Sequence, residues 1–136
     1  MDIALVKIDK ETRRVEFAGA HRPLVWIHKG EPKEIKGDRL AIGGTHYQKR
    51  LDKIEFTNHE LQMEPGDAIH FFSDGFPDQI GGPNKRRLMG KALRKFFADH
   101  DEKAMPELGN DLEALFETWK GTEMQLDDVL VIGIRF

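Results

Sequence analysis

The hydrophobic pattern of this chain changes its period after Gly82, and this change constrains the fold more than any single residue does. Upstream, short alternating apolar runs such as 14–20 are separated by turn residues, which is typical of antiparallel strands. Downstream, apolar residues recur every three or four positions over 88–97 and 105–120, as on the buried face of a helix. Segment 127–136 then returns to a strand pattern. This order predicts an α+β fold, with two helices packed on antiparallel β-sheet.

The first half of the chain is expected to be a meander of short strands joined by tight turns. Segment 38–52 has no clear period and contains adjacent glycines, so it is predicted to be a loop. A strand is expected to restart around Ile54 and Phe56. The apolar run 68–74 indicates a strand buried on both faces. The remaining strands are expected at 2–9, 23–30 and 32–37.

Length and composition are those of one soluble domain. The 136 residues are 39% hydrophobic and 33% charged, with a formal net charge of -3. No basic face is implied, so nucleic acid is not an expected partner, and the short basic cluster 84–87 is interpreted as a solvated turn. The absence of cysteine excludes disulfides and thiolate chemistry. No apolar run is long enough to cross a membrane, so we expect a cytoplasmic protein without membrane contact by this segment.

Two acidic sites stand at the ends of strongly apolar runs. Asp74 follows "AIHFFS", and the pair Asp127–Asp128 precedes "VLVIGIRF". If these strands are adjacent and antiparallel, the carboxylates converge on one sheet edge. Crowded carboxylates repel one another unless a cation neutralises them, and their hard oxygens suit Mg²⁺ and Mn²⁺. By this reasoning alone a second interpretation stays open, in which Asp74–Gly75 is only a turn and Asp127–Asp128 an exposed loop.

Other catalytic chemistries find little support in the sequence. His21 and His70 have no helix-spaced partner, and no Cys/His cluster exists. Ser73 is the only serine and lacks a surrounding nucleophile-elbow motif. No glycine-rich loop of the nucleotide-binding kind precedes a helix.

Three ordered blocks carry a family resemblance over nearly the whole chain. They are "EFAGAHRPLVWIHKGEPKEIKGDRLAIGG", "LQMEPGDAIHFFSDGFPDQIGG" and "QLDDVLVIGIRF". In this order they resemble the C-terminal part of a SpoIIE-like phosphatase domain. That domain is the bacterial branch of the metal-dependent (type 2C, PPM) serine/threonine protein phosphatases.

The resemblance implies an α-β-β-α sandwich with two Mn²⁺ or Mg²⁺ ions at one end of the sheets. By motif match, Asp74 and Asp127 are similar to metal-binding aspartates of the family. Asp128 would orient its neighbour or a water, and Gly75 would let the backbone turn sharply behind Asp74. His21 matches a turn of the family and is expected to be structural.

The chain also departs from the family. The family's earlier "D-x-x-G-H-G" motif, whose Asp bridges both metals, has no counterpart here. The chain is therefore expected to be the C-terminal portion, residues 1–136, of a single phosphatase domain that lacks the first metal motif. We expect weak or no metal binding and negligible activity from it alone. Uncovered apolar surface and open sheet edges further predict a homodimer or a rearranged assembly.

The leading hypothesis is thus a part of a protein serine/threonine phosphatase of bacterial signalling. The resemblance implies a phosphoprotein substrate of the anti-sigma-factor-antagonist type, sensor domains upstream in a parent protein that can itself be membrane-anchored, and a role in sigma-factor regulation. The alternative is a non-catalytic docking or regulatory domain, in which the carboxylates are merely surface turns.

Overall fold

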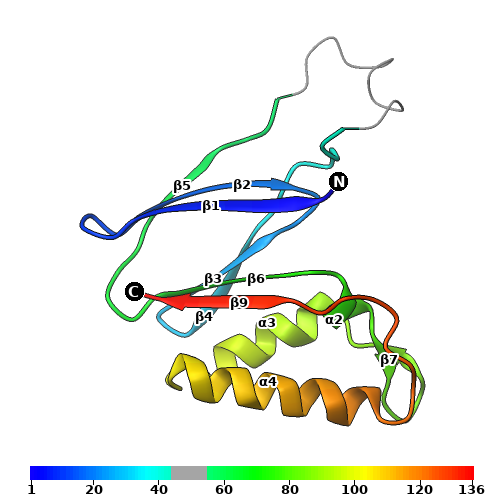
Figure 1. The fold of residues 1–136 in the computed structure, drawn as a ribbon. Coiled ribbons are helices and arrows are strands. Elements are labelled where there is room, and N and C mark those ends of the chain that lie inside the picture. Colours follow the sequence, from blue (N-terminus) through cyan, green and yellow to red (C-terminus); the bar gives the residue numbers. More distant parts are fainter. Residues whose placement is uncertain (44–54) are drawn as a thin grey trace.

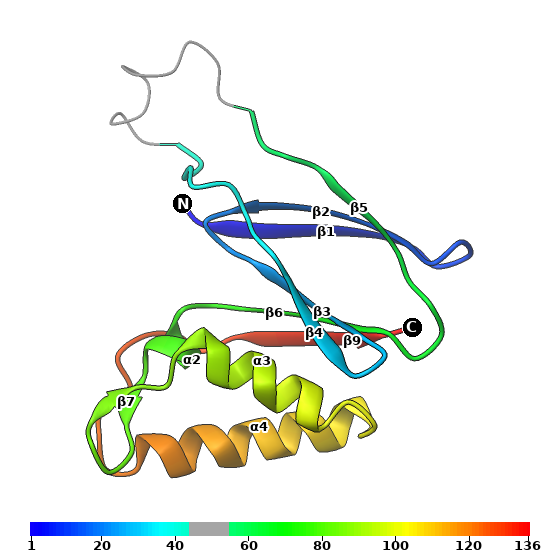
Figure 2. The same cartoon turned by 180° about the vertical axis from the view of Figure 1, so that it is seen from behind.

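The computed structural model describes residues 1–43 and 55–136 and shows three layers (Figures 1 and 2). A three-stranded sheet lies over a four-stranded sheet, and helices α3 and α4 cover the far face of the latter. The α+β prediction is confirmed. The strands are β1 (Ile3–Asp9), β2 (Arg14–Ala20), β3 (Leu24–His28), β4 (Glu31–Ile35), β5 (His59–Gln62), β6 (Ala68–Phe72), β7 (Ile80–Gly81), β8 (Arg86–Arg87) and β9 (Val131–Arg135); the helices are α2 (Gly75–Asp78), α3 (Gly90–Asp99) and α4 (Met105–Lys120).

The upper sheet has the strand order β1-β2-β5, and all its pairs are antiparallel. Alternation places Val15 and Phe17 of β2 inward, where both are fully buried. They form a core with Leu24, Met63 and Ile69. Leu24 and Ile69 lie on β3 and β6 of the facing sheet, and Met63 directly follows β5. The space between the two sheets is therefore a hydrophobic layer.

The lower sheet has the order β4-β3-β6-β9, so β6 is an interior strand. Its first three residues, Ala68, Ile69 and His70, are all buried, which confirms the expected burial on both faces. Ile69 faces the upper sheet, and Ala68 belongs to the core under the helices. The strand consequently ties both hydrophobic cores together.

The two predicted helices form and pack their apolar stripes on the lower sheet. Leu93 and Phe97 of α3 and Leu108 and Phe116 of α4 are buried in one cluster. Gly121 follows α4 with a φ of 55°, as expected of a glycine that ends a helix. No helix in the described ranges is long and apolar enough to span a membrane.

Some local predictions were wrong. The strand expected around Phe56 begins only at His59, and Ile54 lies outside the described residues, as does the 44–52 part of the predicted loop. The helix expected from Leu88 starts at Gly90. Helix α2 and the small β7–β8 hairpin, which contains the basic cluster, were not predicted. These are elements of one turn or two residues, too short to show a period.

Candidate metal centre

The two acidic sites meet because β6 and β9 are paired. The strands run antiparallel, with Phe72 opposite Val131. Asp74 lies two residues beyond the end of β6, and Asp128 lies three residues before β9 begins. The condition stated in the sequence analysis, that the two strands are adjacent and antiparallel, is therefore met, and the pairing brings the segment after β6 against the segment before β9.

Ser73 joins these two segments. Its backbone N–H donates to the Leu130 carbonyl at 2.9 Å, which extends the β6–β9 ladder by one residue. Its hydroxyl accepts from the Leu130 N–H at 3.0 Å and donates to the Asp128 carbonyl at 2.8 Å. The hydroxyl gives the Leu130 N–H an acceptor at the point where the chain leaves β6 for α2. One side chain thus fixes the backbone on both sides of Val129.

Gly75 lets the two segments approach closely. A Cβ added there would lie less than 3.0 Å from the Asp128 carbonyl oxygen and 3.1 Å from that of Asp127. Gly75 was expected from the sequence to allow a sharp turn of the backbone. It does not have a positive φ, however, and is the first residue of α2. Glycine is required here by close packing and not by a strained backbone.

The Asp74 carboxylate pairs with a cation of the protein itself. Arg22 Nη2 donates to Asp74 Oδ2 at 2.8 Å, and the same nitrogen lies 3.1 Å from Asp2 Oδ2. The Asp74 side chain is 46% exposed, so water reaches it. The hydrogen bond from Arg22 lowers the pKa of Asp74 below its ordinary value, because it favours the charged carboxylate. Asp74 is therefore ionised at neutral pH.

Asp127 and Asp128 are both exposed. One carboxylate oxygen of Asp127 accepts the backbone N–H of Asp128 at 2.7 Å, and Gln125 donates to the Asp127 carbonyl at 2.9 Å. These bonds give the segment before β9 a defined backbone. Each carboxylate keeps oxygen atoms toward solvent.

The donors suit a hard divalent cation in kind but not in number. Mg²⁺ and Mn²⁺ prefer carboxylate oxygens, which Asp74 and Asp127 offer. Within residues 1–43 and 55–136, however, no three His, Asp or Glu side chains gather closely enough to hold a metal ion. A complete centre would need further ligands.

Arg22, which lies in the connection between β2 and β3, was not predicted from the sequence as a residue of this site. Its neighbour His21, expected to be structural, has a φ of 59° and donates its backbone N–H to the Asp38 carbonyl. Arg22 and Asp74 are 52 residues apart, and no periodic signal links them. Only the packing of the two sheets brings them together.

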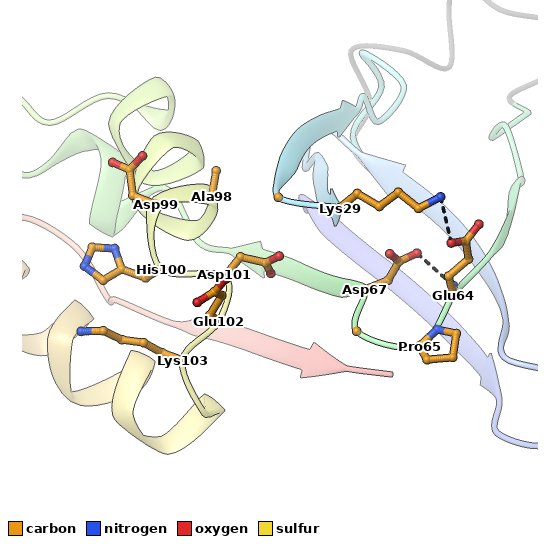
Figure 3. A pocket seen from close by; sticks show the side chains of 12 residues that line it. Lys29, Glu64, Pro65, Asp67, Ala98, Asp99, His100, Asp101, Glu102 and Lys103 are labelled. Carbon is orange, nitrogen blue, oxygen red and sulfur yellow. Dashed lines mark hydrogen bonds and ion pairs between the residues drawn. The ribbon is translucent and has the colours of Figure 1, made fainter.

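The opposite end of β6 presents another acidic group, beside a pocket between the β3–β4 turn and the α3–α4 loop (Figure 3). There Lys29 pairs with Glu64 at 3.1 Å, and Asp67 accepts the backbone N–H of Glu64. Asp67 is only 3% exposed and also accepts from Trp26 Nε1 at 3.0 Å. This aspartate is fully engaged inside the protein.

Comparison with known proteins places this geometry in a family. The family model for Stage II sporulation protein E (SpoIIE) matches residues 1–136. A search of the curated proteins found no match. Among solved structures, the chain is similar to the SiaA-PP2C domain of Pseudomonas aeruginosa, with 31% identity, a TM-score of 0.87, and coverage of 99% of this chain and 51% of that one.

Two more distant structures share the fold. They are the phosphatase domain of the cell fate determinant SpoIIE from Bacillus subtilis (Mn presoaked; 15% identity, TM-score 0.72, 99% of this chain and 56% of that one) and the S. agalactiae serine/threonine phosphatase (16% identity, TM-score 0.60, 97% and 57%). The chain spans about half the length of these solved chains. The match over all 136 residues and the shared fold lead to one conclusion: the chain belongs to the SpoIIE family, whose solved neighbours are PP2C phosphatase domains.

Proposed function

We propose that residues 1–136 form one part of a metal-dependent protein serine/threonine phosphatase domain. The observation that carries this proposal is the junction of β6 and β9, where Asp74–Gly75 packs on the backbone of Asp127–Asp128. At this junction the two aspartates that match the family motif lie on adjacent segments at one end of the sheet, and the Ser73 hydroxyl links these segments through its bonds to Asp128 and Leu130.

In this proposal Asp74 and Asp127 are ligands of Mn²⁺ or Mg²⁺, and Asp128 orients its neighbour or a bound water. Two divalent ions held at such a site would lower the pKa of a water molecule and neutralise charge on a phosphoryl group. This chain's own residues hold the two carboxylates in place. Gly75 allows their backbones to approach, and the Ser73 hydroxyl prevents the segments from separating.

The remaining ligands are proposed to come from outside residues 1–136. The two carboxylates identified here are fewer than the ligands of a complete site, so the isolated chain is expected to bind metal weakly and to hydrolyse phosphoesters negligibly. The proposed substrate is a phosphoprotein of the anti-sigma-factor-antagonist type in bacterial signalling. The proposed location is the cytoplasm, with sensor domains elsewhere in a parent protein.

A homodimer is proposed for the isolated chain. Leu5 on the edge strand β1 is 63% exposed, and Leu130, just before the edge strand β9, is 58% exposed. Open strand edges beside apolar side chains favour pairing with another chain. Light scattering at high protein concentration tests this, and a monomer throughout would contradict it.

A chimera tests the phosphatase proposal directly. Residues 1–136 replace the matching part of the SiaA-PP2C domain, and hydrolysis of p-nitrophenyl phosphate is measured with Mn²⁺. We expect activity in the chimera, loss of at least about a hundredfold in Asp74→Asn and Asp127→Asn because a metal ligand is removed, and no activity in the isolated chain.

The matched control is Asp99→Asn, which removes a carboxylate from the exposed end of α3. It is expected to keep the activity of the chimera. A folded chimera that binds no Mn²⁺ would contradict the proposal and favour a docking or regulatory domain. Activity of the isolated chain that depends on Asp74 would contradict its expected inactivity.

A further inference from the structure

Arg22 lies between two carboxylates that belong to different sheets. Asp2 immediately precedes β1 of the upper sheet, and Asp74 follows β6 of the lower sheet. A single nitrogen, Arg22 Nη2, contacts both, at 3.1 Å and 2.8 Å. The Arg22 side chain is 23% exposed and lines one cavity with both acids. Its positive charge is therefore shared between the two acids.

The backbone that carries Arg22 is held firmly. Its carbonyl oxygen packs between Gly19 and Gly37, and a Cβ at either glycine would lie less than 3.0 Å from it. The Asp38 N–H donates to the Gly19 carbonyl at 2.8 Å, which closes this connection. Because the backbone is enclosed, the side chain is the part of Arg22 that can move.

A divalent cation at Asp74 would meet the charge of this guanidinium. Like charges this close repel each other, although water screens a pair that is partly exposed. The cation and the guanidinium would both bind the Asp74 carboxylate. Asp2 offers the guanidinium a second partner at nearly the same distance.

We propose that Arg22 competes with the divalent cation for Asp74, and that Asp2 retains the guanidinium when the cation binds. This inference rests on the proposed role of Asp74 as a metal ligand. Arg22 is then the residue that neutralises Asp74 while no metal is bound, and it sets the metal concentration at which the site fills. Asp2 and Arg22, although paired with each other, have opposite effects on metal affinity.

The experiment measures Mn²⁺ binding to the full chain by the paramagnetic broadening of the Ser73 and Gly75 amide NMR signals, which detects weak binding without any assay of activity. Arg22→Gln is expected to tighten Mn²⁺ binding about threefold to fivefold, because the competing charge is lost. Asp2→Asn is expected to weaken it about threefold, because Arg22 then pairs with Asp74 alone. In the double variant the Asp2 effect should fall below about twofold.

Three controls accompany these variants. Arg22→Lys keeps the charge and should stay near the wild type. Arg14→Gln removes a charge from the distant Arg14–Glu60 pair and should change little. Asp74→Asn should abolish the broadening, which shows that the signal reports this carboxylate.

Each other outcome is decisive. Weaker or unchanged binding in Arg22→Gln overturns the competition and makes Arg22 an orienting residue for Asp74. An Asp2 effect that persists in the double variant makes Asp2 a ligand itself and overturns its assigned role. Broadening that does not depend on Arg22 contradicts this inference alone. No broadening near Asp74 in any variant also contradicts this inference, whereas the proposed metal role is decided separately by Mn²⁺ binding to the chimera.

Discussion

An aspartate lies beyond each end of strand β6, and the two differ in burial and in the number of hydrogen bonds that they accept. Asp67, just before the strand, is 3% exposed and accepts hydrogen bonds from the Trp26 indole N–H and the Glu64 backbone N–H. Its Oδ1 also lies 3.0 Å from His28 Nδ1. Asp74, beyond the other end, is 46% exposed and contacts a single arginine nitrogen. The Asp67 carboxylate is buried and hydrogen-bonded inside the protein, whereas the Asp74 carboxylate is open to solvent and can bind another group.

The difference shows which acid can take part in chemistry. A buried carboxylate with all its hydrogen bonds made inside the protein stabilises the fold, and removing it leaves unpaired donors. An exposed carboxylate in a surface ion pair adds little stability and can exchange its partner. Asp67 belongs to the first kind and Asp74 to the second, although the sequence around each shows Asp beside Gly.

The largest expected effect separates the two ends directly. Asp67→Ala should lower the free energy of unfolding by about 2–4 kcal/mol, because it leaves the Trp26 indole and the Glu64 N–H without an acceptor. Asp74→Ala should cost less than about 1 kcal/mol. Urea denaturation of both variants checks this. Equal losses would break the comparison.

His70, in the middle of β6, provides a test by pH. Burial lowers its pKa to about 4, and its ring stacks on Phe97 at 4.0 Å. The unfolded chain binds this proton near pH 6.5, so stability is complete above that pH and is lost as the pH falls from about 6.5 toward about 4, by up to about 3 kcal/mol. We expect His70→Leu to flatten this dependence in urea titrations between pH 7.5 and 5. An unchanged slope would assign the pH dependence to other groups.

A smaller effect than those of Asp67 and His70 is expected for Ser73, which lies at the same end of β6 as Asp74. Ser73→Ala should cost about 1 kcal/mol, because the Leu130 N–H loses its acceptor and the Asp128 carbonyl loses a donor. The Leu130 amide should then exchange with solvent faster, as hydrogen exchange would show. Ser73→Thr keeps the hydroxyl and should restore protection. If alanine left the exchange unchanged, the hydroxyl would not be what joins the two segments.

Prediction from the sequence was accurate where side chains repeat with a clear period. The apolar stripe of Leu108, Leu112 and Phe116 indicated α4 with its observed bounds, and the apolar run 68–74 indicated an interior strand. It was wrong where elements are short: β5 begins at His59, and α2 follows Asp74 directly. A single turn or a four-residue strand has too few residues for packing to leave a pattern.

The candidate site divides in the same way. Asp74 and Asp127 could be singled out because each stands at the end of a strongly apolar run, and the contact between the segments that carry them followed from antiparallel pairing. Arg22 could not, because its contact with Asp74 joins two sheets across 52 residues. Ser73 was noticed only for the nucleophile motif that it lacks, whereas the structure gives its hydroxyl two backbone partners.

The sequence by itself determined the α+β class, the helical segments and the two acidic strand ends, because hydrophobic period and chain order are local properties. The tertiary structure alone decided which aspartate beside β6 is buried and which is exposed. It also decided that Gly75 packs closely against the Asp127–Asp128 backbone and that Arg22 pairs with Asp74. These depend on the distance between segments far apart in the chain, and such distances arise only when the two sheets pack.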